Sequence, residues 1–211
     1  RNPADAVDPP KPERKSMRAL DDGEMAELLK YVEETQLYMP VLLAVTTGLR
    51  RGEILALRWQ DIDIDKTQAT VTRSLEQTKD GLRFKRPKTE RSSRNVALPS
   101  YTVDALRHHR IEQAKQRLKL GPIYADQDLI CAREDGAAIR RSPMAHVRFH
   151  DLRHTHATHL LKQGIHPKVV SERLGHSKIG ITLDTYSHVM PGMQEDAASR
   201  IDLALRNALL D

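Results

Sequence analysis

The stretch HDLRHTHATHLLKQGIHPKVVSERLGHSKIGITLDTY, residues 150–186, holds the richest set of reactive side chains in the chain. Two histidines, an arginine and a terminal tyrosine follow one another at spacings that suit attack on a phosphodiester: His150, Arg153, His176 and Tyr186. The first two lie three residues apart on a predicted helix, so both can face one anion. A second helix is predicted between Pro167 and Gly175, which places the second histidine just past its end.

The remaining composition sets limits on the fold and the partner. A chain of 211 residues can bury a full core and fits one domain with tails. Neither a bilayer-spanning apolar run nor a cleavable signal pattern is present, so we expect a soluble cytoplasmic protein, with no membrane partner. The net charge of +5 favours a polyanionic partner. Cys131 stands in a short apolar run, which predicts a buried strand and a structural thiol.

The chain divides into three parts. Residues 1–20 are rich in proline and charge and have no apolar face, so we expect a linker or arm from a further upstream domain. Residues 21–190 carry the periodic segments of one globular domain. Residues 191–211 form a predicted helical tail with an apolar stripe at four-residue steps, made by Met193, Ala197, Ile201, Leu205 and Leu209.

Three helices are predicted at the start of the domain. The first begins at Asp21 or Asp22 as N-cap and repeats apolar residues at helical spacing. The second covers about residues 39–47, and Gly48 is typical of a left-handed helix stop. The third covers residues 51–57, so Arg50 falls on the tight turn between the two.

Between Arg58 and Pro99 the apolar period changes to alternation, which predicts one small antiparallel sheet. The basic excess of the chain falls in the second half of this region, at Lys79, Arg83, Lys85, Arg86, Lys88, Arg91 and Arg94. A solvated basic strand edge explains this run as well as a DNA contact does. Ser100 is then the predicted cap of a helix with Val103, Leu106, Ala114 and Leu118 on its apolar face.

Five separated motifs, in this order, carry a resemblance to a known family. They are TTGLRRGE at 46–53, PKT at 87–89 before SSR, HDLRHT at 150–155, LGH at 174–176 and TYSH at 185–188. From residue 20 to about 198 the chain resembles the tyrosine recombinases, or phage integrases. The resemblance implies a mainly α-helical catalytic domain with a small antiparallel β-sheet (α+β), which cuts and rejoins DNA through a covalent 3′-phosphotyrosine.

The same resemblance assigns six catalytic residues: Arg50, Lys88, His150, Arg153, His176 and Tyr186. The two arginines would clamp the phosphate, since guanidinium groups match its geometry and stay charged. The tyrosine would be the nucleophile, with His150 as base because a phenol is weakly nucleophilic. The lysine would protonate the leaving 5′ oxygen, and His176 would donate a hydrogen bond to a phosphate oxygen. This chemistry requires neither ATP, a cofactor nor a metal.

Other interpretations of single residues remain open. Tyr186 by itself suits an ordinary core tyrosine. Arg51 stands next to Arg50 and has the same charge, although the helix stop favours Arg50 as the clamp. Glu53 lies three residues after Arg50 and suits either a salt bridge or a solvated position.

The histidines of the central stretch and the segment after them allow two further readings. The same helix as His150 also carries His154, His156 and His159, which suggests a metal site as an alternative. No carboxylate or cysteine completes a usual ligand set, however. We expect these three to lie on a helix face or core edge and to help position the catalytic pair. Residues 166–190 also fit a helix-turn-helix of a non-catalytic DNA-binding protein, in which neither Arg50 nor Lys88 needs its motif. A type IB topoisomerase shares the chemistry but not the LGH and TYSH pattern.

The expected partners follow from the family resemblance and the composition. They are double-stranded DNA, further copies of the chain in a tetrameric synaptic complex that the tail holds together, and possible accessory bending or excision factors. With 4% aromatic residues, phosphate contacts should dominate affinity, so binding should weaken steeply with salt. The segment at 144–148 is shorter than in family members by about one helix, which predicts an altered support beneath His150.

Overall fold

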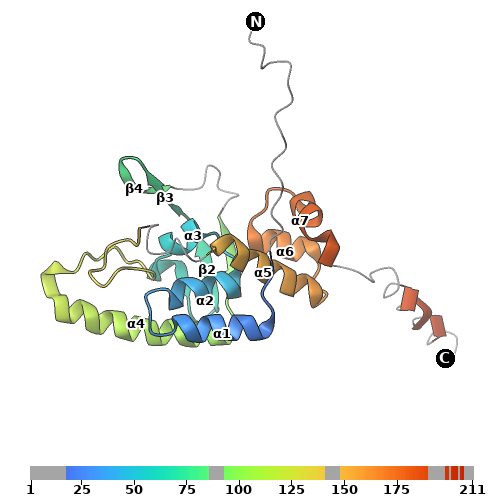
Figure 1. The fold of residues 1–211 in the computed structure, drawn as a ribbon, viewed down its shortest axis with the longest axis horizontal. Coiled ribbons are helices and arrows are strands. Elements are labelled where there is room, and N and C mark those ends of the chain that lie inside the picture. Colours follow the sequence, from blue (N-terminus) through green and yellow to red (C-terminus); the bar gives the residue numbers. More distant parts are fainter. Residues whose placement is uncertain are drawn as a thin grey trace, which may run out of the picture.

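The computed structural model describes residues 18–85, 93–140 and 148–189 and, in the tail, residues 198–199, 201–203 and 205–206. The described residues form helices and two small antiparallel sheets, one of which, a hairpin, projects from the edge of the molecule (Figure 1). The mainly helical α+β class predicted from the sequence is therefore confirmed. Lys88, most of the 1–20 linker, residues 144–147 and the tail residues Met193, Ala197 and Leu209 lie outside the described residues.

The first three helices confirm the predicted ones. α1 (Asp22–Val32) begins with a capping box, in which the carboxylate of Asp21 accepts from the Glu24 amide and the Glu24 carboxylate accepts from the Asp21 amide. α2 (Tyr38–Thr47) is buried along nearly its whole length and ends at Gly48, whose φ of 67° is left-handed. α3 (Arg51–Ala56) follows after only three residues. Arg50 is thus held between two packed helix ends.

The prediction of one sheet is wrong, because there are two among the described residues. β1 (Ile62–Asp63), β2 (Gln68–Val71) and β5 (Arg94–Ala97) form a three-stranded sheet in the order β1-β2-β5. β3 (Ser74–Thr78) and β4 (Gly81–Lys85) form a separate hairpin. The physical reason is that β5 occupies the edge of β2 that the hairpin would otherwise extend. The sequence did not reveal β3, since its five residues hold one apolar side chain, Leu75.

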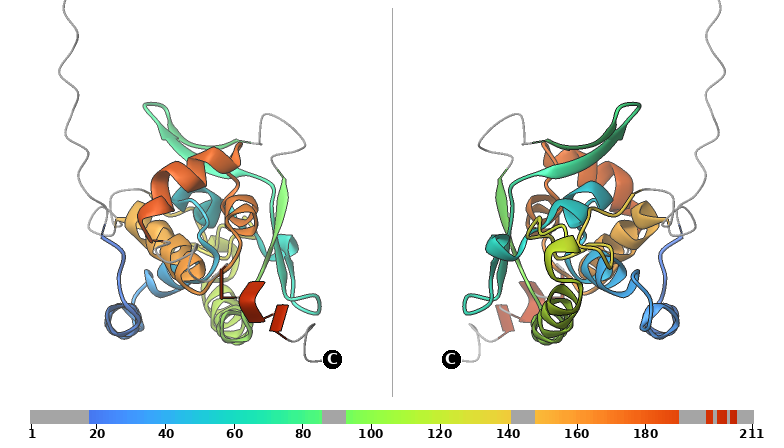
Figure 2. Two further views of the ribbon diagram at one scale, coloured as in Figure 1. Left: turned by 90° about the vertical axis from the view of Figure 1, so that its right-hand side faces the viewer. Right: turned by 90° about the vertical axis from the view of Figure 1, so that its left-hand side faces the viewer.

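α4 (Ser100–Leu120) lies on the side opposite the β3–β4 hairpin in all views (Figure 1, Figure 2). Its N-cap is Pro99 and not Ser100, and no side chain caps it. Val103 and Leu106 are buried as predicted, whereas Leu118 is 84% exposed. Ala114 is also exposed. The predicted apolar face therefore covers only the first half of the helix, because the second half continues past the core.

Cys131 is buried, as predicted, but it is not part of a strand. Its segment makes only isolated bridges, between Arg58 and Leu129 and between Ala132 and Ala138. Burial of the segment comes from the packing of its apolar side chains against α2 and α4 rather than from a sheet ladder.

Three further helices bear the C-terminal motifs: α5 (Phe149–Lys162), α6 (Pro167–Leu174) and α7 (Ile179–Tyr186). Short 3-10 turns lie at Trp59–Asp61, Gly121–Ile123 and Ser187–Val189. α5 joins two hydrophobic clusters, since Leu152 packs in the large N-terminal core and Ala157 packs in a smaller core with α6 and α7. The polar residues of α5 between these two positions lie at the junction of the cores.

None of the described helices is both long and apolar enough to cross a membrane. In the tail, Ile201, Leu203 and Leu205 expose more than half of their surface.

Candidate active site

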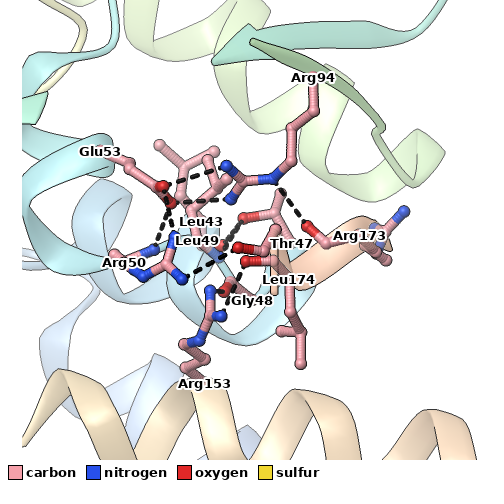
Figure 3. Close-up of polar contacts among 11 residues, drawn as sticks. Leu43, Thr47, Gly48, Leu49, Arg50, Glu53, Arg94, Arg153, Arg173 and Leu174 are labelled. Atoms are coloured by element: carbon pink, nitrogen blue, oxygen red, sulfur yellow. Dashed lines mark hydrogen bonds and ion pairs between the residues drawn. The ribbon is translucent and has the colours of Figure 1, made fainter. Parts of the chain in front are cut away.

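Arg50 and Arg94 share one buried carboxylate, that of Glu53 (Figure 3). Arg50 donates to it from Nη1 at 3.0 Å and from its backbone amide at 2.8 Å. Arg94 donates from Nη1 and Nη2 at 3.0 and 2.8 Å, which is a bidentate pair. Burial alone would raise the pKa of Glu53, but the hydrogen bonds and charges of Arg94 and Arg50 outweigh it and lower that pKa. Glu53 is therefore an ionised positioning group and not a solvated one.

Arg153 is almost completely buried and has backbone carbonyls as its partners. Nη1 donates to the carbonyl of Gly48 and Nη2 to that of Leu174, both at 2.7 Å. Burial and, second to it, the positive charge of Arg50 together lower its pKa to about 10. The guanidinium thus remains charged at neutral pH, in a place where a nearby anion would be strongly attracted.

The C-terminal end of α6 brings these arginines together. Three consecutive carbonyls each accept from a different arginine: Arg173 O from Arg94 Nε at 3.1 Å, Leu174 O from Arg153 Nη2 at 2.7 Å, and Gly175 O from Arg50 Nη2 at 3.1 Å. Figure 3 shows the guanidinium groups approaching this helix end from different sides. The last carbonyls of a helix lack intrahelical donors and carry partial negative charge, so they suit cationic side chains.

The two candidate histidines differ in exposure. His176 follows the left-handed Gly175, and its Nδ1 lies 2.8 Å from the Thr182 hydroxyl. Burial together with the charges of Arg153 and Arg50 lowers the pKa of His176 to about 4, so the ring is neutral at physiological pH. His150 lies exposed on the first turn of α5, near enough to His176 for its charge to act on that ring.

Tyr186 ends α7 and is only 4% exposed. Its ring stacks on that of His154, with centroids 5.0 Å apart. Burial raises the pKa of the phenol, whereas the positive charge of Arg153 acts in the opposite direction. The structure therefore places the predicted nucleophile beside the buried arginine, in the smaller core.

A further pair, His156 and Arg173, ties α5 to α6. Arg173 Nε donates to His156 Nε2 at 3.0 Å, and His156 Nδ1 lies 2.8 Å from the carbonyl of Val45. Because a guanidinium only donates and a carbonyl only accepts, His156 is neutral with its proton on Nδ1. Burial and the charge of Arg173 lower its pKa to about 4. Arg173 also donates from Nη2 to the carbonyls of Thr46 and Ala97, at 3.0 and 2.9 Å.

Five of the six predicted site residues lie in described segments. Arg50, Arg153 and His176 meet at the end of α6. The charge of Arg153 acts on Tyr186, and the charge of His150 acts on His176. Lys88 lies outside the described residues. It is Arg50 whose side chain reaches the carbonyl of Gly175, which favours it over Arg51 as the clamp.

Sequence reasoning missed Arg94 and Arg173, and it underestimated His156. Arg94 was placed in a basic strand region, but it shares a β5 face with the buried Val96 two residues later, so alternation points it inward. Arg173 lies three residues after the buried Val170 on α6. The spacing signals were present, but charge by itself suggested solvent exposure.

No set of three His, Cys, Asp or Glu side chains suited to a metal occurs within the described segments. His156 and His159 reach the backbone carbonyls of Val45 and Leu20 instead. That these histidines help to position His150 and Arg153 stays a prediction.

Comparison with known proteins gives a consistent result. The family model described as "Phage integrase family" matches residues 18–192. A "Tyrosine recombinase XerC-like" protein of Caldanaerobacter subterraneus subsp. tengcongensis is 33% identical over 93% of the chain, and the ICEBs1 integrase of Bacillus subtilis is 29% identical over 96%. The chain spans 57% and 59% of the length of these two relatives.

Solved structures share the fold. The Tn1549 transposon integrase in complex with circular intermediate DNA superposes with a TM-score of 0.72 at 18% identity, covering 94% of this chain and 70% of that one. The catalytic domain of bacteriophage HP1 integrase superposes with a TM-score of 0.52 at 20% identity, covering 87% and 95% of the two chains.

Proposed function

Because this chain belongs to the phage integrase family, we propose that it is the catalytic part of a site-specific DNA recombinase, with integration or excision of a mobile element as its task. Double-stranded DNA is the proposed substrate. Residues 21–190 form the proposed catalytic domain, and the preceding residues are the proposed connection to a DNA-binding domain outside this chain. Action on DNA would place the protein at the nucleoid of the cell.

The observation that carries the proposal is the convergence of distant motifs at one helix end. Arg50 and Arg153 are separated by about half of the chain, yet they donate to the adjacent carbonyls of residues 175 and 174. His176 follows in the same turn. A repressor with a helix-turn-helix would need α6 and α7 but would not need two arginines gathered behind them.

In the proposed reaction, the Tyr186 oxygen attacks a DNA phosphorus and the bond from that phosphorus to the 5′ oxygen breaks. The phenol proton passes to His150, and Lys88 gives a proton to the departing 5′ oxygen. Arg50 and Arg153 stabilise the negative charge that develops on the non-bridging oxygens. The 3′-phosphotyrosine preserves the energy of the broken bond, so attack by a new 5′ hydroxyl reseals DNA and releases the tyrosine.

The buried position of Tyr186 has a consequence for this reaction. The residue is only 4% exposed and its ring stacks on His154, so little of the side chain is open to a DNA backbone in this conformation. We expect the end of α7 to shift toward the phosphate when DNA binds. The positive charge of Arg153 then favours the phenolate at the new position.

The experiment is covalent capture. The 211-residue chain is incubated, in the presence of a chelator, with a pool of nicked duplexes of randomised sequence, and denaturant-resistant protein–DNA adducts are selected and quantified. We expect an adduct that Tyr186→Phe abolishes and that Arg153→Ala nearly abolishes, with most DNA binding retained. An adduct that persists in Tyr186→Phe would show that the nucleophile is another residue. Tight binding without any adduct would favour the non-catalytic helix-turn-helix protein.

A second measurement separates recombination from the topoisomerase alternative. Captured sequences are placed in two different duplexes, and exchange of strands between them is measured beside relaxation of supercoiled plasmid. We expect exchange only between duplexes that carry the captured site. Relaxation without site dependence would instead indicate a type IB topoisomerase. Assembly of tetramers and any accessory bending or excision factor belong to this same proposal.

A further inference from the structure

The carbonyls at the end of α6 accept hydrogen bonds from three arginines. A fourth arginine, Arg173 of α6 itself, fixes the position of this helix end. Arg173 lies one residue before Leu174, whose carbonyl holds Arg153. Its guanidinium bonds to His156 on α5, to Thr46 near the end of α2 and to Ala97 at the end of β5. One side chain therefore links the helix end to three other elements.

His156 is suited to be the acceptor in this link. Its Nδ1 proton is committed to the carbonyl of Val45, which leaves the Nε2 lone pair directed at Arg173. It lies one turn beyond Arg153 on α5 and is 7% exposed. The position of the α6 end relative to Arg153 is thus set through a partly buried hydrogen bond between the same two helices.

We propose that the last carbonyls of α6 orient the phosphate-clamping arginines. We further propose that Arg173 and His156 are positioning residues, which hold this helix end where its carbonyls reach Arg153 and Arg50. This inference rests on the proposed recombinase function for its kinetic effect. Neither residue touches the reacting atoms. Both act through Leu174 and Gly175, whose carbonyls orient Arg153 and Arg50.

Matched substitutions test the acceptor. His156→Gln keeps an oxygen near the position of Nε2, whereas His156→Asn keeps a group near Nδ1 and loses the acceptor for Arg173. Arg173→Lys keeps the positive charge but cannot reach all of its present acceptors at once. His159→Gln is the control on the same helix, because His159 contacts the carbonyl of Leu20 rather than Arg173.

The kinetic readout is single-turnover adduct formation on captured nicked duplex, with the dissociation constant for DNA measured separately. We expect Arg173→Lys and His156→Asn to slow adduct formation about 10- to 100-fold, as misplaced catalytic groups do, with DNA binding changed less than about 3-fold. His156→Gln and His159→Gln should stay near the wild-type rate. The double variant of Arg173→Lys and His156→Asn should be no slower than the slower single variant. Wild-type rates in both disruptive variants, or an equal loss in His156→Gln, would overturn the proposal.

A second readout needs no DNA and no activity. In the folded chain, the side-chain NMR signals of Arg153, assigned with Arg153→Lys, should show slowed rotation of its Nη groups, because both are hydrogen-bonded. Arg173→Lys and His156→Asn should release this restriction, and His159→Gln should not. Unchanged Arg153 signals in both disruptive variants contradict the positioning role even if the chain forms no adduct at all. If the wild-type chain forms no adduct but shows the expected slowed rotation of Arg153, only the proposed function is contradicted.

Discussion

Glu53 carries a buried negative charge between two arginines, so its removal leaves charge without compensation. Glu53→Gln should lower the free energy of unfolding by about 3 kcal/mol, since the mostly buried guanidinium of Arg94 is left without its carboxylate partner. Chemical denaturation at pH 7 measures this change.

The control for Glu53 is the exposed pair of Arg107 with Asp104, whose side chains are 56% and 70% exposed. Asp104→Asn should change stability by less than about 1 kcal/mol. Equal effects of the two substitutions would mean that the Glu53 pair contributes no more than a surface contact.

His156 predicts a pH dependence of stability. Its pKa is about 4 in the folded chain and 6.5 in the unfolded chain, so between these values the unfolded chain binds a proton that the folded chain does not. Stability is therefore highest above pH 6.5 and falls as the pH is lowered toward 4, by about 2–3 kcal/mol from this residue. The lowered pKa of Glu53 acts in a different window, below its ordinary 4.5.

Urea unfolding at pH 7.5 and pH 5, for the wild type and His156→Gln, checks this expectation. The variant should lose less stability between the two values, because Gln does not titrate. Half-buried His176 remains in both proteins and contributes a smaller decline in the same direction. Identical declines would show that His156 is not buried in its neutral form.

At the scale of elements, the turn between α2 and α3 determines the site. Gly48 has a φ of 67°, and a Cβ there would lie 2.6 Å from the His156 ring and 2.7 Å from Leu174. Gly48→Ala should therefore lower the unfolding free energy by about 2–4 kcal/mol, through left-handed strain and overpacking together.

Gly164 supplies the matched comparison for Gly48. It also has positive φ, at 77°, but a Cβ there would meet nothing within 4 Å. Gly164→Ala should lose only the conformational part, about 1 kcal/mol. Thermal or chemical unfolding of the two variants separates strain from close packing, and equal losses would contradict the tight approach of α2, α5 and α6.

Elements with strong periodicity could be predicted from the sequence, whereas elements that depend on contacts with distant residues could not. α1, α2 and α6 have caps, stops and apolar spacing that local chemistry dictates. The β3 strand has little apolar pattern, and β5 joins β2 through pairing with residues more than twenty positions away. The second half of α4 has a helical pattern although its apolar residue Leu118 is 84% exposed.

At the scale of the whole molecule, the described residues of the tail leave apolar side chains exposed. Ile201 and Leu205, two members of the predicted stripe, are 63% and 57% exposed. We propose that the tail packs on a neighbouring copy when the chain assembles on DNA, because exposed apolar surface favours burial at an interface.

Truncation after Gly192 should abolish the higher-order protein–DNA complexes and leave binding of a single copy. Gel shift with captured duplexes, followed by light scattering, measures both species. Ile201→Ser with Leu205→Ser should reproduce the effect within the complete tail. Unchanged assembly of the truncated chain would refute the role of the tail.

The sequence by itself identified the side chains that are proposed for catalysis. Short motifs contain all six of these residues: Arg50, Lys88, His150, Arg153, His176 and Tyr186. A motif can identify them because the proposed phosphoryl transfer needs particular side-chain types. Local helix signals were equally readable, since caps and periodicity act over a few residues.

Only the tertiary structure decided how these side chains are held. Glu53 between Arg50 and Arg94, three arginines on consecutive carbonyls of α6, and Tyr186 buried against His154 all depend on atoms far apart in sequence. A backbone carbonyl carries no sequence identity, so no motif records that it will be an arginine's partner. The physical reason is that hydrogen bonding and burial depend on distance in space, which is fixed only when the two cores pack together.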